Sequence, residues 1–385
     1  MKALLVITGR GMGGDAVNAL NIARSLEKKG IQCELALDKN APGLLFKNNG
    51  YTWHKVSVPQ AGGHAATKIA TAKAGFRTIK AAFETRNLIK KLKVDVVVGI
   101  IGGGAVVGCI ASKLANVPAV GIIDTPTDTK VCTKLNTCIV LPEAQLFRSN
   151  NIPENVFKSF FPLTPGLTKG DKDKALDEIK KSIKKSIEGK NLKLEDLFDE
   201  NKPSILFSSG SSLFEMMAKA VANASNLELS DLSERYNLLL VGIPLEEDYL
   251  DLINNKKVIN LGYITWIRDL YELIDLAVLT DDGVMIQEAM ACELPAIALT
   301  RVKYGRYHNM AGIFPGAVIE ADIDNLNNKI EEALLDLDEI KSNSKKYSKE
   351  VLSSGEKIAE IVIKEANKKL IKKTVKRTNK GTNNK

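Results

Sequence analysis

Short runs of apolar residues alternate along the chain with stretches whose apolar positions have helical spacing. The run Ala3–Thr8 is followed by a glycine cluster and then by helical spacing over Ala16–Lys29, which predicts a strand, a loop and a helix. The same pattern then predicts strands at Ile31–Leu37, Val56–Val58, Asp95–Ile101 and Pro118–Ile123, with a helix at Val106–Ala115. Strands that alternate with helices form parallel sheets that are covered on both faces.

The alternation stops near Pro142–Pro165 and begins again after a charged stretch at Lys169–Asn201. The second part is predicted to hold strands at Ser204–Ser208, Leu238–Val241, Val258–Leu261, Leu276–Thr280 and Ala296–Leu299, and helices at Leu213–Ala224, Ile267–Leu273 and Gly283–Ala291. The predicted fold class is therefore α/β, with two Rossmann-like doubly wound domains. Ligands bind at the carboxyl ends of parallel strands, so we expect both domains to face a central cleft that holds the ligand.

The breaks in the pattern give the expected domain boundaries. Residues 1–165 form an N-terminal domain and residues 166–345 a C-terminal domain. Residues 346–370 form a C-terminal helix that can pack back on the N-terminal domain. Residues 371–385 are rich in Lys, Asn and Thr, and we expect them to be a disordered basic tail.

Composition narrows the class of protein. The 385 residues are 44% hydrophobic and 26% charged, which fills two cores and excludes a fibrous or mostly disordered chain. The net charge of +8 comes from the C-terminal end, because residues 368–385 hold eight bases and no acid. We interpret this end as solvated, with contact to anionic lipid or RNA as the alternative. The five cysteines show no metal-ligand spacing and fit a reducing cytosol.

Neither a signal peptide nor a membrane span is predicted. Residues Met1–Ile7 lead directly into glycines and are interpreted as a first strand. The apolar stretch from Val94 to Ala111 contains Asp95 and five glycines, so a strand and a loop explain it better than a spanning helix. The expected location is therefore cytoplasmic.

Three glycine-rich segments follow predicted strands, at Gly9–Asp15, Gly99–Ala105 and Ser208–Ser212. Glycine lets a ligand approach the backbone closely, and the N–H groups at the start of the following helix favour an anion. The first segment is not a strict dinucleotide fingerprint, because Asp38 only loosely meets the requirement for an acidic residue, and no segment has a phosphate-loop lysine. Together the three segments predict a phosphate-bearing ligand.

The segment from Asp281 to Ala296 carries the most specific signal. Gly283 in a loop is followed five residues later by Glu288 on a helix, and seven residues after that by Pro295. This spacing resembles the nucleotide-sugar motif of the two-domain GT-B glycosyltransferases. The resemblance implies that Glu288 holds the ribose hydroxyls of the donor.

The order of further motifs is similar to one branch of that superfamily, the MurG-like transferases, over most of the chain. These motifs are Gly11–Asp15 followed by Asn18-Ala19-Leu20, Asp95–Gly99, Phe207–Ser211 and Gly262–Ile264. The resemblance implies an inverting, metal-independent transfer of a sugar from a UDP-sugar to a lipid-linked acceptor. The sugar expected from the resemblance is N-acetylglucosamine. The acceptor would be a polyprenyl-diphosphate-linked cell-wall precursor, and the enzyme would be peripheral on the inner face of the cell membrane. No cofactor and no specific nucleic acid are expected.

The resemblance also assigns site residues. Asp15 stands where the family has a histidine, and it is the expected catalytic base, with a helix cap as the alternative role. The expected donor-binding residues are Ser209, Gly210, Ser211, Ser212, Ile264, Gly283, Val284, Met285, Glu288, His308 and Asn309. The expected acceptor-binding residues are Gly13, Gly14, Asn18, Gly103, Gly104 and Asp124. No metal ligands are expected.

Some residues depart from the family pattern, and others have more than one possible function. The arginine that the family places after the domain crossover is missing, so Lys303, Arg306, His308 or Arg10 would have to compensate the diphosphate. Asp322-Ile323-Asp324 matches the Asp-x-Asp pattern of a metal-binding motif, but we interpret it as the start of a helix. Other segments that can border the acceptor are His54 with His64, and Thr125–Asp128.

Residues 68–93 combine eight bases with helically spaced apolar residues. Such a helix either lies on an anionic membrane surface or covers the sheet with a basic solvated face. Two rival functions also remain at this point. One is a UDP-N-acetylglucosamine 2-epimerase of the same fold, and the other is a non-catalytic nucleic-acid-binding protein that uses the basic tail. The Lys/Asn/Ile-rich composition suggests an archaeal relative that acts on a pseudomurein precursor.

Overall fold

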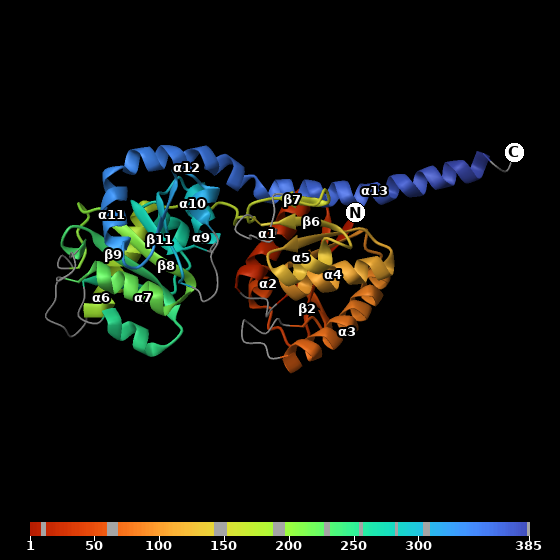
Figure 1. Ribbon diagram of the computed structural model, residues 1–385, viewed down its shortest axis with the longest axis horizontal. Helices are drawn as coiled ribbons and strands as arrows, with labels where there is room; N and C mark the ends of the chain where they lie inside the picture. The colour runs from red at the N-terminus through yellow and green to blue at the C-terminus, as the bar shows by residue number, and fades with distance from the viewer. Residues whose placement is uncertain are drawn as a thin grey trace. The chain divides into compact units, whose positions relative to one another are not determined.

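The computed structural model describes residues 1–8, 13–59, 68–141, 152–187, 197–226, 232–253, 257–281, 284–302 and 309–382 (Figure 1). The chain divides into two compact units. Unit 1 comprises Met1–Thr164 together with Ser353–Lys385, and unit 2 comprises Pro165–Leu352. Both units have the parallel α/β architecture that the sequence pattern predicts, which confirms the fold class.

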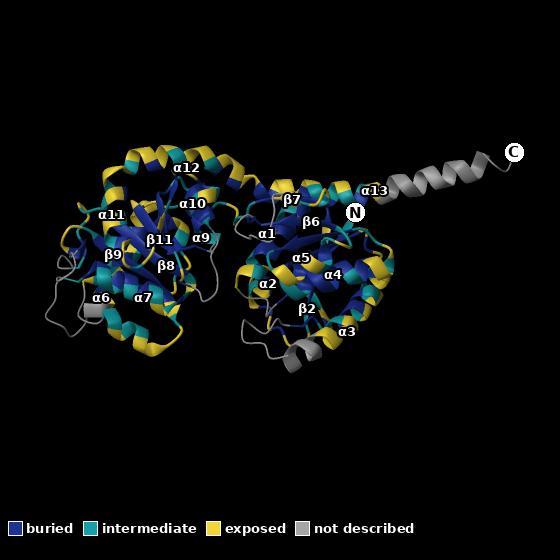
Figure 2. Cartoon of the chain, viewed as in Figure 1, coloured by how far each residue is buried: buried dark blue, intermediate teal, exposed yellow. Residues whose placement is uncertain are grey.

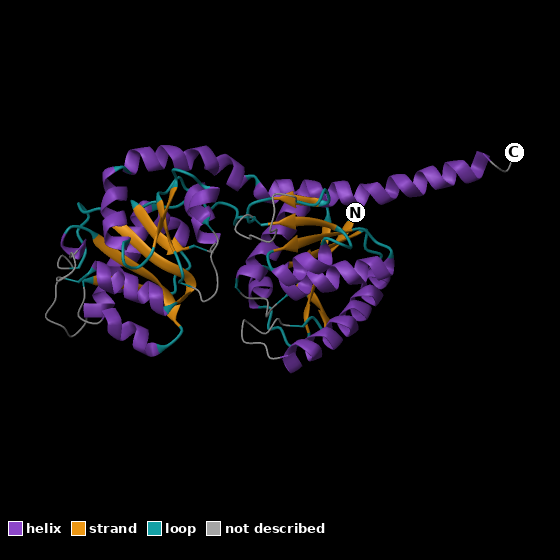
Figure 3. Ribbon diagram, viewed as in Figure 1, coloured by secondary structure: helices purple, strands orange, loops and turns teal. Residues whose placement is uncertain are grey.

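The sheet of unit 1 has seven strands in the order β3-β2-β1-β4-β5-β6-β7, and each neighbouring pair is parallel (Figure 3). The central strand β1 is buried from Ala3 to Ile7, as a strand covered on both faces must be. The strands are β1 (Lys2–Ile7), β2 (Gln32–Asp38), β3 (Trp53–Val56), β4 (Val96–Ile100), β5 (Ala119–Ile123), β6 (Thr137–Val140) and β7 (Val156–Lys158).

Helices cover this sheet through apolar faces. Ile89 of the long helix α3 and Val107 of α4 pack with Leu4, Val6 and Val97 in one buried cluster. The C-terminal helix α13 contacts α1, β4 and β5, and Ser354 at its start donates a hydrogen bond to the carbonyl of Phe161 at 2.7 Å. The helices of unit 1 are α1 (Gly14–Lys28), α2 (Leu44–Asn48), α3 (Lys68–Leu92), α4 (Ile101–Ala115), α5 (Pro126–Cys132) and α13 (Ser354–Thr382).

The sheet of unit 2 has six parallel strands in the order β10-β9-β8-β11-β12-β13. Its strands are β8 (Ser204–Leu213), β9 (Asn237–Pro244), β10 (Val258–Gly262), β11 (Leu276–Thr280), β12 (Ala296–Leu299) and β13 (Val318–Ala321). Its helices are α6 (Lys172–Ile187), α7 (Glu215–Ala224), η2 (Leu232–Glu234), η3 (Glu247–Ile253), α8 (Ile267–Tyr271), α9 (Val284–Ala291), α10 (Met310–Ile313), α11 (Leu326–Leu335) and α12 (Leu337–Leu352).

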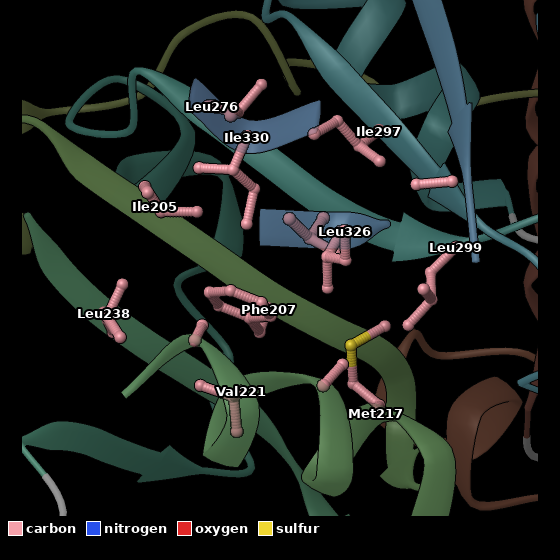
Figure 4. Packing of buried hydrophobic residues seen from close by; sticks show 14 of the residues in the cluster. Ile205, Phe207, Met217, Val221, Leu238, Leu276, Ile297, Leu299, Leu326 and Ile330 are labelled. Atoms are coloured by element: carbon pink, nitrogen blue, oxygen red, sulfur yellow. The ribbon is translucent and has the colours of Figure 1, made fainter. Parts of the chain in front are cut away.

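The core of unit 2 lies between the sheet and the helices α7 and α11 (Figure 4). Phe207 of β8 is fully buried among Met217 and Val221 of α7 and Leu326 and Ile330 of α11. Truncating a buried phenylalanine to alanine costs about 3–5 kcal/mol, so this contact contributes strongly to the stability of the unit. Figure 2 shows that in both units the strands are mostly buried, whereas the outer helices carry the exposed positions.

Four local differences from the sequence-based prediction stand out. Strands β6, β7 and β13 were not predicted, because each is short and lies beside prolines or loops. Strand β8 continues to Leu213 with a shift in register between Ser208 and Ser212, so the third glycine segment is the irregular end of a strand rather than a separate loop. The helix predicted over residues 346–370 is divided between α12 and α13, and α13 continues to Thr382 through residues for which disorder was predicted.

None of the helices in the described ranges is long and apolar enough to cross a membrane. All five cysteines are free thiols.

Candidate functional site

The irregular end of β8 is held in shape by its own serine side chains. The Ser208 hydroxyl oxygen lies 3.1 Å from the carbonyl of Val241 on β9 and accepts the N–H of Gly210 at 3.2 Å. The Ser209 hydroxyl donates to the carbonyl of Ser212 at 2.8 Å and accepts the N–H of Phe214, the N-cap of α7, at 3.1 Å. The hydroxyls of Ser208 and Ser209 therefore hold the turn in shape. For Ser209 this structural role differs from the predicted direct contact with the donor.

The tip of the same turn is open. Gly210 has φ +98°, a backbone conformation that favours glycine, and within the part of the chain that the structure describes no atom lies within 4 Å of the position that a Cβ would occupy there. Ser211 is exposed and Ser212 is half-buried. The part of the turn that can meet a ligand is therefore Gly210–Ser212.

A contact between side chains joins this turn to the helix that carries Glu288. Ser208 Oγ lies 3.5 Å from Sδ of Met285 on α9. Strand β8 also pairs with β11, which leads into α9, so the two predicted donor segments lie at the same carboxyl edge of the sheet. Gly283 and His308, with the alternative cations Lys303, Arg306 and Arg10, lie outside the described residues.

Glu288 lies in the second turn of α9, and Tyr271 at the end of α8 fixes its carboxylate. The Tyr271 hydroxyl donates to Glu288 Oε2 at 2.9 Å, and Tyr271 is only 4% exposed. Burial raises the pKa of Glu288, and the hydrogen bond from Tyr271 acts against that rise. The sequence predicted the helix that ends near Tyr271 but gave no signal for this pairing across 17 residues.

Cys292 lies one turn beyond Glu288 on the chain. Burial, reinforced by the charges of Glu288 and Glu272, raises the pKa of the Cys292 thiol to about 12. The thiol is therefore neutral at physiological pH and adds no charge beside the carboxylate.

Two other predicted donor residues lie on the flanks of the sheet. Ile264 is half-buried in the segment after β10, which is separated from β8 by β9. Asn309 is the N-cap of α10, and its side-chain oxygen accepts the N–H of Gly312 at 3.1 Å. A Cβ at Gly312 would lie 2.5 Å from the Asn309 side chain, so this cap is tightly packed.

In unit 1, the described residues leave space around the start of α1. Gly13 is the N-cap with φ +80°, and no atom of the described residues lies within 4 Å of the Cβ positions of Gly13 or Gly14. Asp15 is half-buried in the first turn, where a carboxylate interacts favourably with the helix dipole, but it is not the N-cap.

One turn after Asp15, Asn18 is 2% exposed, and its Oδ1 has no hydrogen-bond partner among the residues that the structure describes. A buried acceptor without a donor costs about 1–3 kcal/mol. A ligand hydroxyl or amide that reached Asn18 would remove this cost, which supports the placement of Asn18 at an acceptor site.

The second glycine segment differs from the prediction. Its N–H groups are used within the protein, since Gly102 donates to Asp128 Oδ2 at 2.8 Å and Gly104 donates to the Thr8 hydroxyl. A Cβ at Gly103 would lie 2.6 Å from the carbonyl oxygen of Pro59, and one at Gly104 would lie 2.6 Å from that of Val6. Gly103 and Gly104 are therefore required for close packing of the protein's own backbone.

Asp128 takes the place that a bound anion would have at this helix start. It is fully buried, and its carboxylate accepts the N–H groups of Gly102, Asp124 and Thr125. Burial raises the pKa of Asp128, while these hydrogen bonds oppose the rise. Asp128 also completes the capping box of α5 with Thr125, so the Thr125–Asp128 segment joins two helix starts.

The remaining polar candidates have structural roles. His54 Nε2 lies 3.0 Å from Glu34 on the neighbouring strand. Asp322 accepts the N–H groups of Asp324 and Asn325 and so closes the turn before α11, which is the predicted helix start. Within the described ranges, no group of three or more His, Cys, Asp or Glu residues could hold a metal ion.

Comparison with known proteins finds a match to a family model over part of the chain. Residues 5–120 match the glycosyltransferase family 28 N-terminal domain. The chain is 32% identical over 120 residues to a UDP-N-acetylglucosamine–N-acetylmuramyl-(pentapeptide) pyrophosphoryl-undecaprenol N-acetylglucosamine transferase of Haemophilus ducreyi, and 28% identical over 159 residues to the enzyme of the same name from Acinetobacter baumannii. These matches cover 31% and 41% of this chain, and 33% and 40% of the relatives.

Solved structures extend the likeness in fold to nearly the whole chain. The crystal structure of Acinetobacter baumannii MurG matches 94% of this chain and 99% of its own, with a TM-score of 0.63 and 15% identity. Anabaena HepE in complex with UDP and glucose matches 97% of this chain and 99% of its own, with a TM-score of 0.57 and 17% identity.

Proposed function

We propose that this protein is a MurG-like, UDP-sugar-dependent glycosyltransferase, because residues 5–120 match the glycosyltransferase family 28 N-terminal domain and the chain has the GT-B fold. It transfers N-acetylglucosamine to a polyprenyl-diphosphate-linked cell-wall precursor. The observation that carries the proposal is the match of 120 to 159 residues of the chain to enzymes named for this transfer, together with the family match over residues 5–120. A pseudomurein precursor is the narrower form of the acceptor prediction, and it rests on composition alone.

The donor site of the proposal lies in unit 2. The Glu288 carboxylate, held by Tyr271, binds the ribose hydroxyls, and the open tip Gly210–Ser212 approaches the diphosphate. The uracil packs on the segment around Ile264. Ser208 and its contact with Met285 keep the turn and the helix of Glu288 together. A carboxylate that accepts hydrogen bonds from two hydroxyls makes the charge-assisted contacts that give specific ribose recognition.

The acceptor site of the proposal lies in unit 1, at the open start of α1. Asp15 takes the proton of the acceptor hydroxyl while the hydroxyl oxygen attacks the anomeric carbon of the sugar. The bond from that carbon to the donor's diphosphate oxygen breaks on the opposite face, so the configuration inverts and UDP leaves as the anion. Backbone N–H groups and side-chain cations, rather than a metal ion, stabilise the leaving diphosphate.

The test of this function is transfer of labelled N-acetylglucosamine from UDP-N-acetylglucosamine to a short-chain polyprenyl-diphosphate-linked acceptor in EDTA. Asp15→Asn should lower kcat at least a hundredfold and leave UDP affinity within twofold, because the general base acts only on the acceptor. Conversion of the donor to its manno epimer in the absence of acceptor would instead identify the 2-epimerase. Transfer that depends on added metal ions would contradict the mechanism.

We also propose that α3 docks unit 1 on the anionic inner face of the cell membrane. Phe76, Ile79 and Phe83 are 74%, 58% and 52% exposed, and their spacing places them on one stripe of α3. We call these three residues the apolar stripe. Arg77 and Lys80 are exposed beside it, which suits a surface of anionic headgroups.

Sedimentation with vesicles tests the docking. The wild-type protein should bind anionic vesicles more strongly than neutral ones, and Phe76→Ser with Phe83→Ser should lower that binding at least fivefold. Equal binding of the variant and the wild type would assign α3 only to covering the sheet.

A further inference from the structure

A cavity of about 710 Å³ opens at the carboxyl edge of the unit 1 sheet. It is lined by Asp38 at the end of β2, by Ser57 to Pro59 directly after β3, and by Arg77 and Lys80 of α3. Parallel α/β sheets bind ligands at this edge. Of the described residues assigned above to the donor or to the start of α1, none lines this cavity.

Among the described residues, three cations and one carboxylate line the cavity: Lys39, Arg77 and Lys80, with Asp38. Lys39 forms an ion pair with Glu84 at 3.1 Å, and Glu84 also accepts the N–H and hydroxyl of Ser57 at 2.7 and 3.1 Å. Asp38 accepts the N–H of Asn40 at 2.9 Å in a turn. Arg77 and Lys80, in contrast, have no ion pair or hydrogen bond to any residue in the described ranges.

The positions of these cations on α3 relate the cavity to the apolar stripe. Arg77 and Lys80 are three residues apart and so lie on one side of the helix, next to the face that carries Phe76, Ile79 and Phe83. A molecule with an apolar chain and an anionic head could thus contact the stripe with the chain and the cavity with the head.

The cavity also adjoins the second glycine segment. Pro59 lines the cavity, and a Cβ at Gly103 would lie only 2.6 Å from the Pro59 carbonyl oxygen. The wall therefore packs directly against the start of α4.

We propose that this cavity binds a diphosphate group, with Arg77 and Lys80 as its ligands, and that the group belongs to the lipid-linked acceptor. The inference rests on the proposed function, because the acceptor of that reaction carries a diphosphate between its lipid and its sugar. A guanidinium and an ammonium on adjacent turns can contact both phosphates of the diphosphate, Arg77 through paired N–H donors and Lys80 as a point charge. Ser57 and Lys39 complete the polar wall.

The experiment uses the full chain and soluble probes without membranes. Calorimetry measures the affinity for farnesyl diphosphate, inorganic diphosphate and farnesol in the wild type and in Arg77→Gln with Lys80→Gln. The matched control is Lys113→Gln with Lys130→Gln, which removes the same charge from exposed positions of α4 and α5 in unit 1. UDP affinity is measured for each protein, because it reports on unit 2 alone.

Farnesyl diphosphate should bind the wild type and the control equally and the Arg77/Lys80 variant at least tenfold more weakly, with farnesol unaffected. Unchanged affinity in that variant, or no binding to the wild type, would overturn the proposal. Inorganic diphosphate that binds as tightly as farnesyl diphosphate would overturn the assignment to the lipid and identify a site for free diphosphate. If neither the wild type nor the variants bind UDP, the proposed function is contradicted. The farnesyl diphosphate affinities would still test diphosphate binding in the cavity, because they are measured separately.

Discussion

The second glycine segment of unit 1 and the serine–glycine turn of unit 2 both lie at the carboxyl edge of a parallel sheet, but their glycines have different surroundings. At Gly102–Gly104 the backbone is pressed against the carbonyls of Val6 and Pro59, and its N–H groups bond to Asp128 and Thr8. At Gly210 the space beside the backbone is open. The difference shows that a glycine-rich segment after a strand can serve packing or ligand approach, and that only the neighbours of the segment decide which.

The largest expected effect is at the packed segment. Gly104→Ala should destabilise unit 1 by about 3 kcal/mol or more, because its Cβ would lie 2.6 Å from the Val6 carbonyl and 2.8 Å from the Thr8 nitrogen, both in backbone that cannot shift freely. Thermal or urea unfolding measures the loss. The matched control is Gly14→Ala in the open first turn of α1, which should change stability by less than about 1 kcal/mol. Equal losses would remove the distinction between packed and open glycines.

The second effect is at the open site of unit 2. Glu288→Ala should weaken UDP binding about 10- to 100-fold, because a charge-assisted hydrogen-bonding group contributes about 1.5–3 kcal/mol. Calorimetry with UDP gives the affinity, and farnesyl diphosphate binding serves as the control for unit 1. Unchanged UDP affinity would remove Glu288 from the donor site.

A smaller effect is expected at Tyr271, which orients Glu288. Tyr271→Phe removes the hydrogen bond that opposes the rise of the Glu288 pKa, so that pKa should rise further. UDP affinity should fall about threefold to tenfold, in line with about 1 kcal/mol for one hydrogen bond, and should decline at a higher pH than in the wild type as the solution is acidified. Titration of UDP affinity between pH 5 and 8 tests this, and an unshifted pH profile would reduce Tyr271 to a packing residue.

The smallest effect concerns stability. The pKa of Glu288 in the folded protein lies above its ordinary value, so ionisation of this carboxyl favours the unfolded chain. The protonated carboxyl therefore stabilises the folded protein at low pH, and this stabilisation is lost as the pH rises from the ordinary pKa through the raised one. Glu288→Gln should therefore stabilise unit 2 at pH 7 by about 1 kcal/mol or less, with the gain disappearing below about pH 4. Unfolding at both pH values measures the difference, and a loss of stability at pH 7 would contradict the sign.

The sequence predicted several features that depend on local pattern. The buried runs of β1, β4, β11 and β12 are continuous and apolar, and their strands were found within one residue or so of the observed bounds. The short strands β6 and β13 were missed because each has only four residues and one of them is polar, Thr137 or Glu320, whereas the four residues of β12 are all apolar. The end of β8 was taken for a loop because glycine and serine are typical of turns, while pairing with β9 keeps it in the sheet.

By itself, the order of apolar and polar residues determined that the chain forms two parallel α/β sheets, since burial of both faces of a strand requires a continuous apolar run. The spacing from Gly283 to Pro295 likewise indicated the class of site. Only the tertiary structure decided which polar groups meet. Thr8 and Gly104 are 96 residues apart, and Tyr271 and Glu288 are 17 residues apart on separate helices. Hydrogen bonds act over about 3 Å, so the packing of these elements, rather than local sequence, sets whether an N–H or a carboxylate is used internally or left for a ligand.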